Sequence, residues 1–138
     1  MCTFCEIVAG EIPAHLVLDE QRTLGFLDVR PLFPGHTLLV PKQHHETLSD
    51  LPGELIEPFF STAQRLGQAV QNGTGADGSL LVINNKVSQS VPHLHLHLVP
   101  RRFRDGLRGF LWPRKPYADE SEAEEVAGRI RAALKELE

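Results

Sequence analysis

The sequence lacks three features that would assign it to a broad functional class. No apolar run approaches the roughly 18 residues that a transmembrane helix needs, so we expect no membrane-spanning segment. The formal net charge is -4, so no general basic field favours nucleic acid, although local positive groups could still bind small anions. The first residues lack the basic and apolar regions of a signal peptide.

Cysteine is also scarce, because the chain contains only Cys2 and Cys5. We therefore expect a cytoplasmic protein with reduced thiols. The rest of the composition is ordinary, with 41% hydrophobic and 23% charged residues. A chain of 138 residues with this composition is long enough for one globular domain with a real core, so we predict a single domain over residues 1–138.

Three histidines stand out against this ordinary background. His93, His95 and His97 alternate with Leu94 and Leu96, which is the period of a β-strand and puts the three imidazoles on one side. The strand rise would separate neighbouring histidines by roughly 6–7 Å and the outer pair by roughly 13 Å. A metal binds nitrogen at about 2.0–2.1 Å, so two of these histidines could share an ion but three could not. At least one imidazole must therefore serve another purpose.

The other patterns predict strands on both sides of one long helix. Apolar runs predict strands at residues 16–18, 24–27, 37–40, 79–84 and 92–99. Ser49 or Asp50 is the expected cap of a helix that ends near residues 72–75. Its apolar stripe consists of Leu55, Phe59, Ala63, Leu66 and Val70. Strands before a helix and a hairpin-like pair after it indicate an α+β fold with a mostly antiparallel, five-stranded sheet.

The C-terminal part is expected to contain a loop and a second helix. Residues 101–116 lack periodicity, so we interpret them as an ordered loop over a site or a partner, in which Trp112 either reaches a neighbouring subunit or anchors the loop. Ser121 and Glu124 have the spacing of a capping box. The predicted buried face of this helix consists of Val126, Ile130, Ala133, Leu134 and Leu137.

The run from His93 to Val99 resembles the signature of the histidine triad (HIT) family, in which three histidines alternate with apolar residues. Further matches follow in family order at residues 4, 7, 11–14, 26–28, 34–36, 40–44, 84 and 89–91, so the resemblance covers roughly residues 2–100. It implies a HIT-like fold, with residues 101–138 as a C-terminal loop and helix. It also implies a homodimer whose sheets join, and a nucleotide hydrolase or transferase that acts at the α-phosphate.

The resemblance implies a division of labour among the polar residues. His95 is the expected nucleophile, which forms a nucleotidyl-histidine intermediate, while a backbone carbonyl on its own strand holds its other ring proton. His97 is expected to contact a phosphate oxygen. Gln89 and Ser90 would add donors, and Ser90 could pass a proton to a departing amine. The residues alone favour a polar turn that merely begins a strand, and the resemblance reverses this preference. No magnesium requirement is expected.

The resemblance also implies a nucleoside site. Asp28 would accept both ribose hydroxyls, although a turn aspartate is the ordinary alternative. Phe4, Ile7 and Leu27 would line the base pocket, or belong to the core. An apolar slot of this kind predicts weak base selectivity with purine nucleotide conjugates favoured.

Two segments depart from the family pattern. The segment between Asn84 and Gln89 is shorter than usual and lacks glycines, which predicts a tighter phosphate loop and leaves open whether Asn84 or Asn85 contacts the ligand. After the triad, Pro100-Arg101-Arg102 replaces the Gly-Gly-Arg of phosphoramidase-type members. Adenosine phosphoramidates and dinucleoside polyphosphates therefore both remain possible substrates. Arg101 and Arg102 either contact the distal phosphates of a substrate or are simply solvated.

Cys2 and Cys5 form a Cys-x-x-Cys pair that suits either a metal site or a redox pair. A redox pair normally opens a helix in a βαβ setting, which is missing here. The resemblance supplies His44 and His93 as two further ligands of a structural zinc, with His45 as an alternative to His44. The rival to an enzyme is a zinc-stabilised nucleotide-binding protein that acts through interaction, with little turnover.

Overall fold

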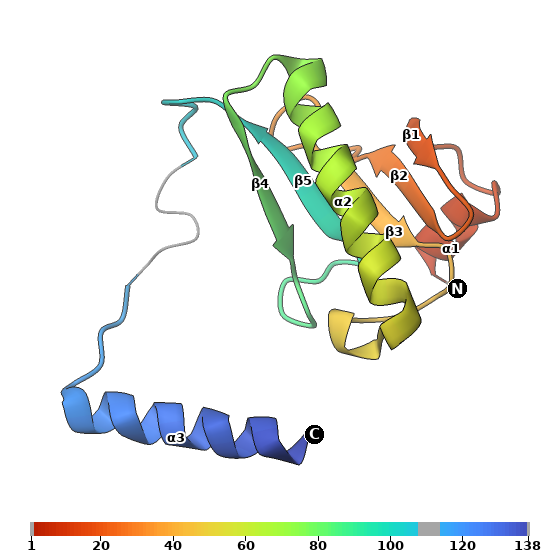
Figure 1. The fold of residues 1–138 in the computed structure, drawn as a ribbon. Coiled ribbons are helices and arrows are strands. Elements are labelled where there is room, and N and C mark those ends of the chain that lie inside the picture. The colour runs from red at the N-terminus through yellow and green to blue at the C-terminus, as the bar shows by residue number, and fades with distance from the viewer. Residues whose placement is uncertain (1, 108–113, 138) are drawn as a thin grey trace. The chain divides into compact units, whose positions relative to one another are not determined.

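The computed structural model describes residues 2–107 and 114–137. The chain divides into two compact units, Met1–Asp105 and Gly106–Glu138 (Figure 1). The prediction that residues 1–138 form a single domain therefore stays a prediction. Among the described residues, no helix is both long and apolar enough to cross a membrane.

The first unit is built on a five-stranded sheet with the strand order β1-β2-β3-β5-β4, in which every neighbouring pair is antiparallel (Figure 1). The strands are β1 (Leu16–Asp19), β2 (Thr23–Leu27), β3 (Thr37–Pro41), β4 (Gly78–Ile83) and β5 (Leu96–Arg101). The helices are α1 (Thr3–Val8), α2 (Gly53–Thr74) and, in the second unit, α3 (Glu120–Glu136), with a 3-10 turn at Leu48–Asp50. The predicted α+β class and antiparallel sheet are confirmed.

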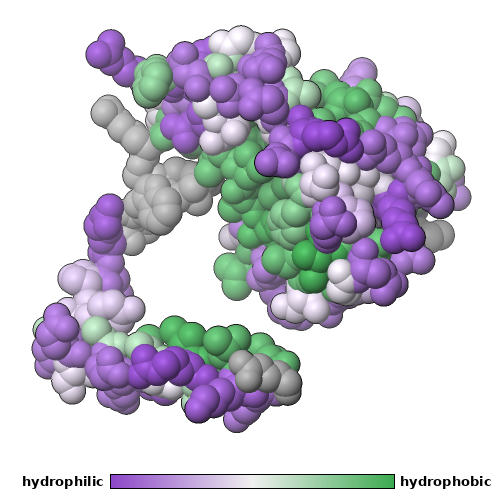
Figure 2. Space-filling view, viewed as in Figure 1, coloured by the Kyte–Doolittle hydropathy of each residue, from purple (hydrophilic) through white to green (hydrophobic). Residues whose placement is uncertain are grey.

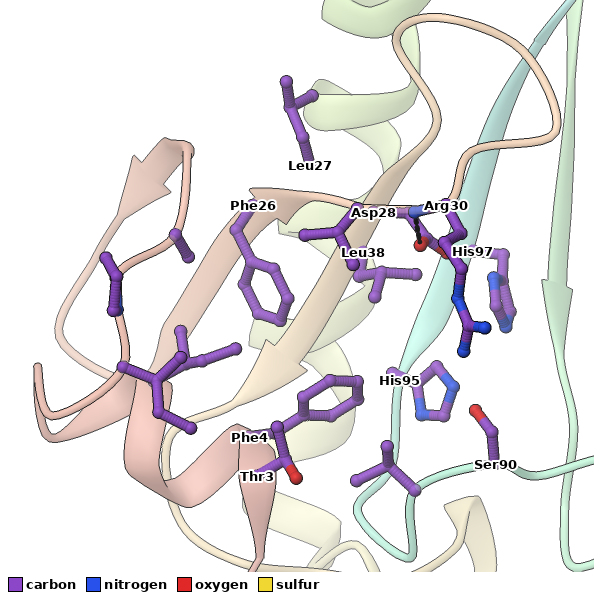
Figure 3. A pocket seen from close by; sticks show the side chains of 16 residues that line it. Thr3, Phe4, Phe26, Leu27, Asp28, Arg30, Leu38, Ser90, His95 and His97 are labelled. Atoms are coloured by element: carbon purple, nitrogen blue, oxygen red, sulfur yellow. Dashed lines mark hydrogen bonds between the residues drawn. The ribbon is translucent and has the colours of Figure 1, made fainter.

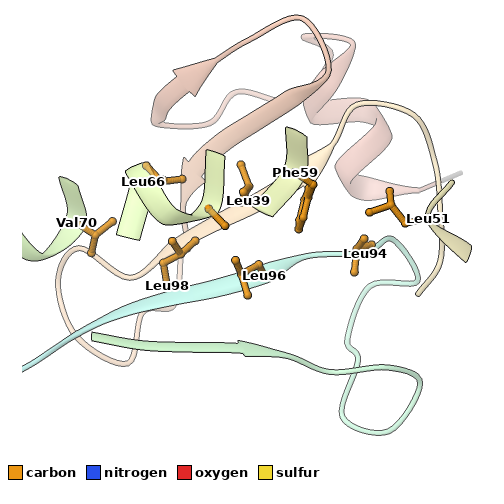
Figure 4. Packing of buried hydrophobic residues seen from close by; sticks show 9 residues of the cluster. Leu39, Leu51, Phe59, Leu66, Val70, Leu94, Leu96 and Leu98 are labelled. Atoms are coloured by element: carbon orange, nitrogen blue, oxygen red, sulfur yellow. The ribbon is translucent and has the colours of Figure 1, made fainter. Parts of the chain in front are cut away.

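The central strand β3 is buried on both faces, which explains its continuous apolar run. Leu39 packs in a cluster beneath α2 (Figure 4). Leu38 and Val40 point to the opposite face and pack with Phe4 of α1. Because side chains alternate along a strand, α1 and α2 cover opposite faces of the sheet.

Helix α2 buries the predicted stripe but does not begin at the predicted cap. Phe59, Ala63, Leu66 and Val70 are buried against the sheet, with Leu55 packed beside them. The N-cap is Pro52, so the prediction of Ser49 or Asp50 was wrong. Asp50 instead closes the preceding 3-10 turn, where its Oδ2 accepts hydrogen bonds from the backbone and hydroxyl of Thr47 at 3.0 and 2.7 Å. The helix ends as predicted, at a left-handed Gly75.

The strand predicted at residues 92–99 was wrong in its first half, because β5 begins only at Leu96. Leu96 pairs with Leu39, and continuing this register would place Leu94 opposite Pro41, which has no N–H to donate. The N–H of Leu94 donates instead to the carbonyl of His45 at 2.6 Å. The alternation of leucines and histidines between the two faces is kept although β5 starts late, since Leu94, Leu96 and Leu98 all lie in the cluster under α2.

The second unit contains α3. The predicted capping box at Ser121 and Glu124 was wrong, because the helix starts earlier: Asp119 is the N-cap and accepts a hydrogen bond from the N–H of Glu122 at 2.8 Å. Within the second unit the predicted face is not buried, and Ile130 is 63% exposed. Hydrophobic residues gather along one side of α3 (Figure 2). Trp112 lies outside the described residues.

Candidate active site and metal centre

A cavity of about 300 Å³ opens on the α1 side of the sheet (Figure 3). Its lining comes from α1, from the end of β2 and the loop that follows, and from the segment that leads into β5. Seven of the predicted site residues meet there: Phe4, Ile7, Leu27, Asp28, Ser90, His95 and His97. The histidine row therefore faces a hollow of the size expected for a small-molecule site.

The inner wall of the cavity is aromatic. The ring of Phe4 meets the rings of Phe26 and His95 edge to face, with centroids 5.4 and 5.0 Å apart. Phe4 is only 7% exposed and belongs to the apolar cluster on this face. Phe4 was expected either to line the base pocket or to belong to the core. In the structure it is a core residue that also lines the cavity.

His95 has one of its ring nitrogens held by the backbone. Its Nδ1 lies 2.8 Å from the carbonyl oxygen of His93. A carbonyl only accepts hydrogen bonds, so Nδ1 carries the proton and Nε2 keeps a lone pair. The acceptor is a backbone carbonyl two residues earlier in the same run, as expected from the sequence, although that residue precedes β5.

His97 contacts a histidine to which the sequence gave no role. Its Nδ1 lies 2.9 Å from Nε2 of His36, which is 4% exposed and stands just before β3. Burial, together with the neighbouring His95 and His36, lowers the pKa of His97 to about 4. Burial also lowers the pKa of His36, against the opposing effect of Asp28. Both rings are therefore neutral at pH 7. The only signal for His36 in the sequence was its place in the family-like run at residues 34–36.

Asp28 lies at the end of β2, on the same wall of the cavity as His97. Its Oδ1 accepts a hydrogen bond from the backbone N–H of Arg30 at 2.9 Å, and its Oδ2 lies 3.7 Å from Nε2 of His36. Arg30 also lines the cavity, which sequence reasoning did not identify. A half-buried carboxylate in this place can accept hydroxyl groups of a ligand.

The loop before the histidines contains two residues in an uncommon backbone conformation, and the prediction that it is tighter than in other HIT proteins stays a prediction. Lys86 and Ser88 both adopt left-handed conformations, with φ of 69° and 62°. Gln89 holds this loop together, since its Oε1 accepts from the N–H of Lys86 at 2.8 Å and its Nε2 donates to the carbonyl of Glu46 at 2.6 Å. Gln89 therefore shapes the loop, whereas Ser90 reaches the cavity.

The two asparagines at the end of β4 differ in their contacts. The side-chain oxygen of Asn85 accepts a hydrogen bond from the N–H of Leu48 at 3.0 Å, so Asn85 supports the 3-10 turn. Asn84 is half-buried and directly follows β4. Neither Asn84 nor Gln89 is among the residues that line the cavity.

A cluster of two cysteines and two histidines lies beside the cavity. Its ligating atoms, from Cys2, Cys5, His44 and His93, all lie within 4.8 Å of one another. The Sγ atoms of Cys2 and Cys5 are 3.3 and 3.5 Å from Nδ1 of His93, and that of Cys5 is 3.4 Å from Nδ1 of His44. Nitrogen and sulfur ligands of one tetrahedral zinc lie roughly 3.5 Å apart, so both the spacing and the donor set suit zinc.

The surroundings of the cluster also favour a metal. Nε2 of His93 lies 2.8 Å from the carbonyl of Pro41, which fixes the ring proton there and turns the Nδ1 lone pair toward the sulfurs. Burial, then the neighbouring Cys2, raises the pKa of the Cys5 thiol, a cost that a bound dication would offset. His45 is not a member of the cluster, so the alternative ligand is not supported.

Comparison with known proteins identifies the same architecture. A model of the HIT domain matches residues 9–104. The adenosine 5'-monophosphoramidase HNT1 of Saccharomyces cerevisiae is 33% identical over 140 residues, which cover 99% of this chain and 83% of the yeast protein.

Solved structures extend the comparison to the fold. A member of the HIT family from Bacillus subtilis matches with a TM-score of 0.84 at 30% identity, covering 95% of each chain. A zinc-bound histidine triad family protein from Mycobacterium smegmatis matches with a TM-score of 0.73 at 36% identity, covering 99% of this chain and 97% of the other.

Proposed function

Because the chain belongs to the HIT domain family, we propose that it is a nucleotidyl hydrolase or transferase that acts at the α-phosphate of purine nucleotide conjugates. One observation carries the proposal: His95 lines the cavity with its Nδ1 proton held by the carbonyl of His93, which leaves Nε2 as a nucleophile. A neutral histidine with a fixed tautomer is suited to attack phosphorus at neutral pH.

The reaction takes two displacements. Nε2 of His95 attacks the α-phosphorus, a nitrogen–phosphorus bond forms, and the bond to the leaving group breaks. Ser90, at the same cavity, donates a proton to a departing amine. Water then attacks the nucleotidyl-histidine: a phosphorus–oxygen bond forms, the nitrogen–phosphorus bond breaks, and one proton of the water returns to Ser90. The nucleotide is released, and His95 and Ser90 are both restored. His97 stabilises the negative charge on the phosphate oxygens.

The rest of the cavity holds the nucleoside. Phe4 and Ile7 form an apolar slot for the base, and Asp28 accepts the ribose hydroxyls. Leu27 borders the cavity, but its side chain points to the face of the sheet opposite that of its neighbour Phe26, so Leu27 is not part of this slot (Figure 3). No magnesium enters this scheme. A zinc held by Cys2, Cys5, His44 and His93 would be structural, since all four positions are filled by protein ligands and none is left for substrate.

Adenosine phosphoramidates are favoured over dinucleoside polyphosphates. Both arginines after the triad are engaged: Arg101 makes a two-point ion pair with Asp105, and Arg102 donates to the carbonyl of Thr74. They are therefore poorly placed to meet distal phosphates. The phosphoramidase activity named for the yeast relative agrees with this choice.

The proposal includes a cytoplasmic homodimer. Strand β4 lies at one edge of the sheet, and its Leu81 is 41% exposed. An edge strand offers unpaired backbone groups to a second copy. Sedimentation should give twice the chain mass, and a monomer at micromolar concentration would contradict this part of the proposal.

The test is a parallel assay of adenosine 5'-phosphoramidate and diadenosine polyphosphates, with His95→Ala as the control. We expect turnover of the phosphoramidate to be faster and to be lost in His95→Ala. Tight nucleotide binding without turnover of either substrate would favour the rival function, a zinc-stabilised interaction protein.

A further inference from the structure

A short hydrogen-bond chain leads from the backbone at Leu32, through His36, to His97. The N–H of Leu32 lies 3.1 Å from Nδ1 of His36. A backbone N–H only donates, so Nδ1 of His36 must offer a lone pair. A neutral imidazole carries one N–H proton, and in His36 this proton must therefore lie on Nε2.

The next link transfers this constraint to His97. Nε2 of His36 donates to Nδ1 of His97 across 2.9 Å, so Nδ1 of His97 is the acceptor and its own proton lies on Nε2. Asp28 does not compete for the His36 proton, because its Oδ2 lies 3.7 Å away, beyond hydrogen-bond range.

His95 and His97 thus have opposite tautomers, although their ring centroids are only 4.9 Å apart. His95 carries its proton on Nδ1, held by the carbonyl of His93, and keeps the lone pair on Nε2. His97 carries its proton on Nε2 and keeps the lone pair on Nδ1, directed at His36. One ring is left as a nucleophile and the other as a hydrogen-bond donor.

We propose that His36 is a positioning residue that fixes His97 in the Nε2–H tautomer, so that His97 meets the phosphate as a donor and does not compete with His95 as a nucleophile. The inference rests on the proposed function for its catalytic meaning, but the tautomers themselves do not depend on turnover.

The tautomer of His36 also distinguishes two groups of metal-ligating side chains. Asp28, His36 and His97 also bring three ligating atoms within 4.8 Å of one another. Nε2 of His36, however, is protonated as long as Leu32 donates to Nδ1, so it offers no lone pair to an ion. In the cysteine-containing cluster the histidine nitrogen that faces the sulfurs is the one free to bind.

The direct test is a two-bond proton–nitrogen NMR spectrum of the full-length protein at pH 7.5, which reports which nitrogen of each histidine ring is protonated. We expect the Nε2–H form for His36 and His97 and the Nδ1–H form for His95, which serves as an internal reference. An Nδ1–H signal for His97 would overturn the proposal, whether or not the protein turns over any substrate.

Two variants separate positioning from simple packing. His36→Gln keeps an amide donor near the place of Nε2, whereas His36→Leu removes it. We expect His36→Leu to give a mixture of His97 tautomers and a roughly 10- to 100-fold lower kcat with little change in KM, and His36→Gln to recover most of the loss. An unchanged His97 tautomer in folded His36→Leu, or equal kcat losses in both variants, would contradict the role. If the wild type shows no turnover, the proposed function fails, while the spectra still decide the tautomers.

Discussion

The Nδ1 atom of His95 lies 2.8 Å from the backbone carbonyl oxygen of His93, whose own side chain belongs to the candidate metal centre. One residue thus serves both sites, its imidazole on the metal side and its carbonyl on the catalytic side. The ring of His93 is also held by the carbonyl of Pro41, at 2.8 Å. The carbonyl that orients His95 therefore has a support that does not depend on a metal.

Cys5→Ser should lower zinc content and thermal stability but spare most of the chemistry. Loss of one of four ligands weakens binding, and a ligand that binds only the folded state stabilises it. Because Pro41 still holds His93, we expect kcat to stay within about tenfold of the parent, the span of one lost net hydrogen bond. Metal analysis and thermal melts check both points.

His45→Ala is the matched control for the zinc prediction, since His45 neighbours His44 without belonging to the cluster. It should keep the parental zinc content. Equal zinc in Cys5→Ser and the parent, or zinc loss in His45→Ala alone, would show that the ligand set is wrong.

Acid should destabilise the protein through His36 and His97. Their pKa values are lowered in the folded state, to about 4 for His97, whereas an unfolded histidine titrates near 6.5. Between these values the unfolded state binds more protons, so the stability from these groups is full above about pH 7.5 and is lost progressively as the pH falls from 6.5 toward the folded pKa, about 4 for His97. At pH 5.5 His97 alone should cost about 1 kcal/mol.

Urea unfolding at pH 7.5 and 5.5 checks this, with His97→Gln as the comparison. The variant should lose about 1 kcal/mol less stability than the parent between the two pH values. An identical pH dependence in the two proteins would mean that His97 titrates normally in the folded state.

Phe4→Leu should weaken both the fold and nucleotide binding. Leucine keeps apolar bulk but removes the edge-to-face contacts with Phe26 and His95. Such contacts contribute about 0.5–1.5 kcal/mol, so we expect a loss of about 1 kcal/mol of stability and a roughly 3- to 10-fold weaker Kd for AMP. Urea unfolding and calorimetric titration measure the two effects. Lower stability with an unchanged Kd would make Phe4 a core residue alone.

The two asparagines after β4 should respond differently to alanine. Asn85→Ala removes the acceptor for Leu48 and should cost about 1 kcal/mol of stability with an unchanged KM. Asn84 does not line the cavity, so Asn84→Ala should leave KM for the phosphoramidate unchanged and should not remove the hydrogen bond to Leu48. A raised KM in either variant, measured beside its unfolding curve, would assign a ligand contact to that asparagine.

Local patterns in the sequence predicted the sheet, the stripe of α2 and the face of the histidines. They failed where a distant partner decides the structure, or where two neighbouring residues compete for the same role. The start of β5 depends on Pro41, which lacks the N–H that a longer ladder needs. The predicted capping box of α3 failed because Asp119, two residues earlier, offered an equally good cap.

In the candidate site, too, local sequence patterns could not predict contacts between residues that are distant in the sequence. The spacing of Cys2 and Cys5 is local, and the family resemblance supplied the two histidines that complete the cluster. The contact between His36 and His97 joins residues 61 positions apart, and no local period reports it. Gln89 was expected to donate to phosphate, but its fixed contacts with Lys86 and Glu46 became visible only once the loop was folded.

The most direct test of the central claim is mass spectrometry of the protein after brief reaction with adenosine 5'-phosphoramidate and an alkaline quench. The account predicts one AMP attached to the peptide that contains His95, and neither adduct nor turnover in His95→Ala. An adduct on another residue, or sustained turnover by His95→Ala, would contradict it.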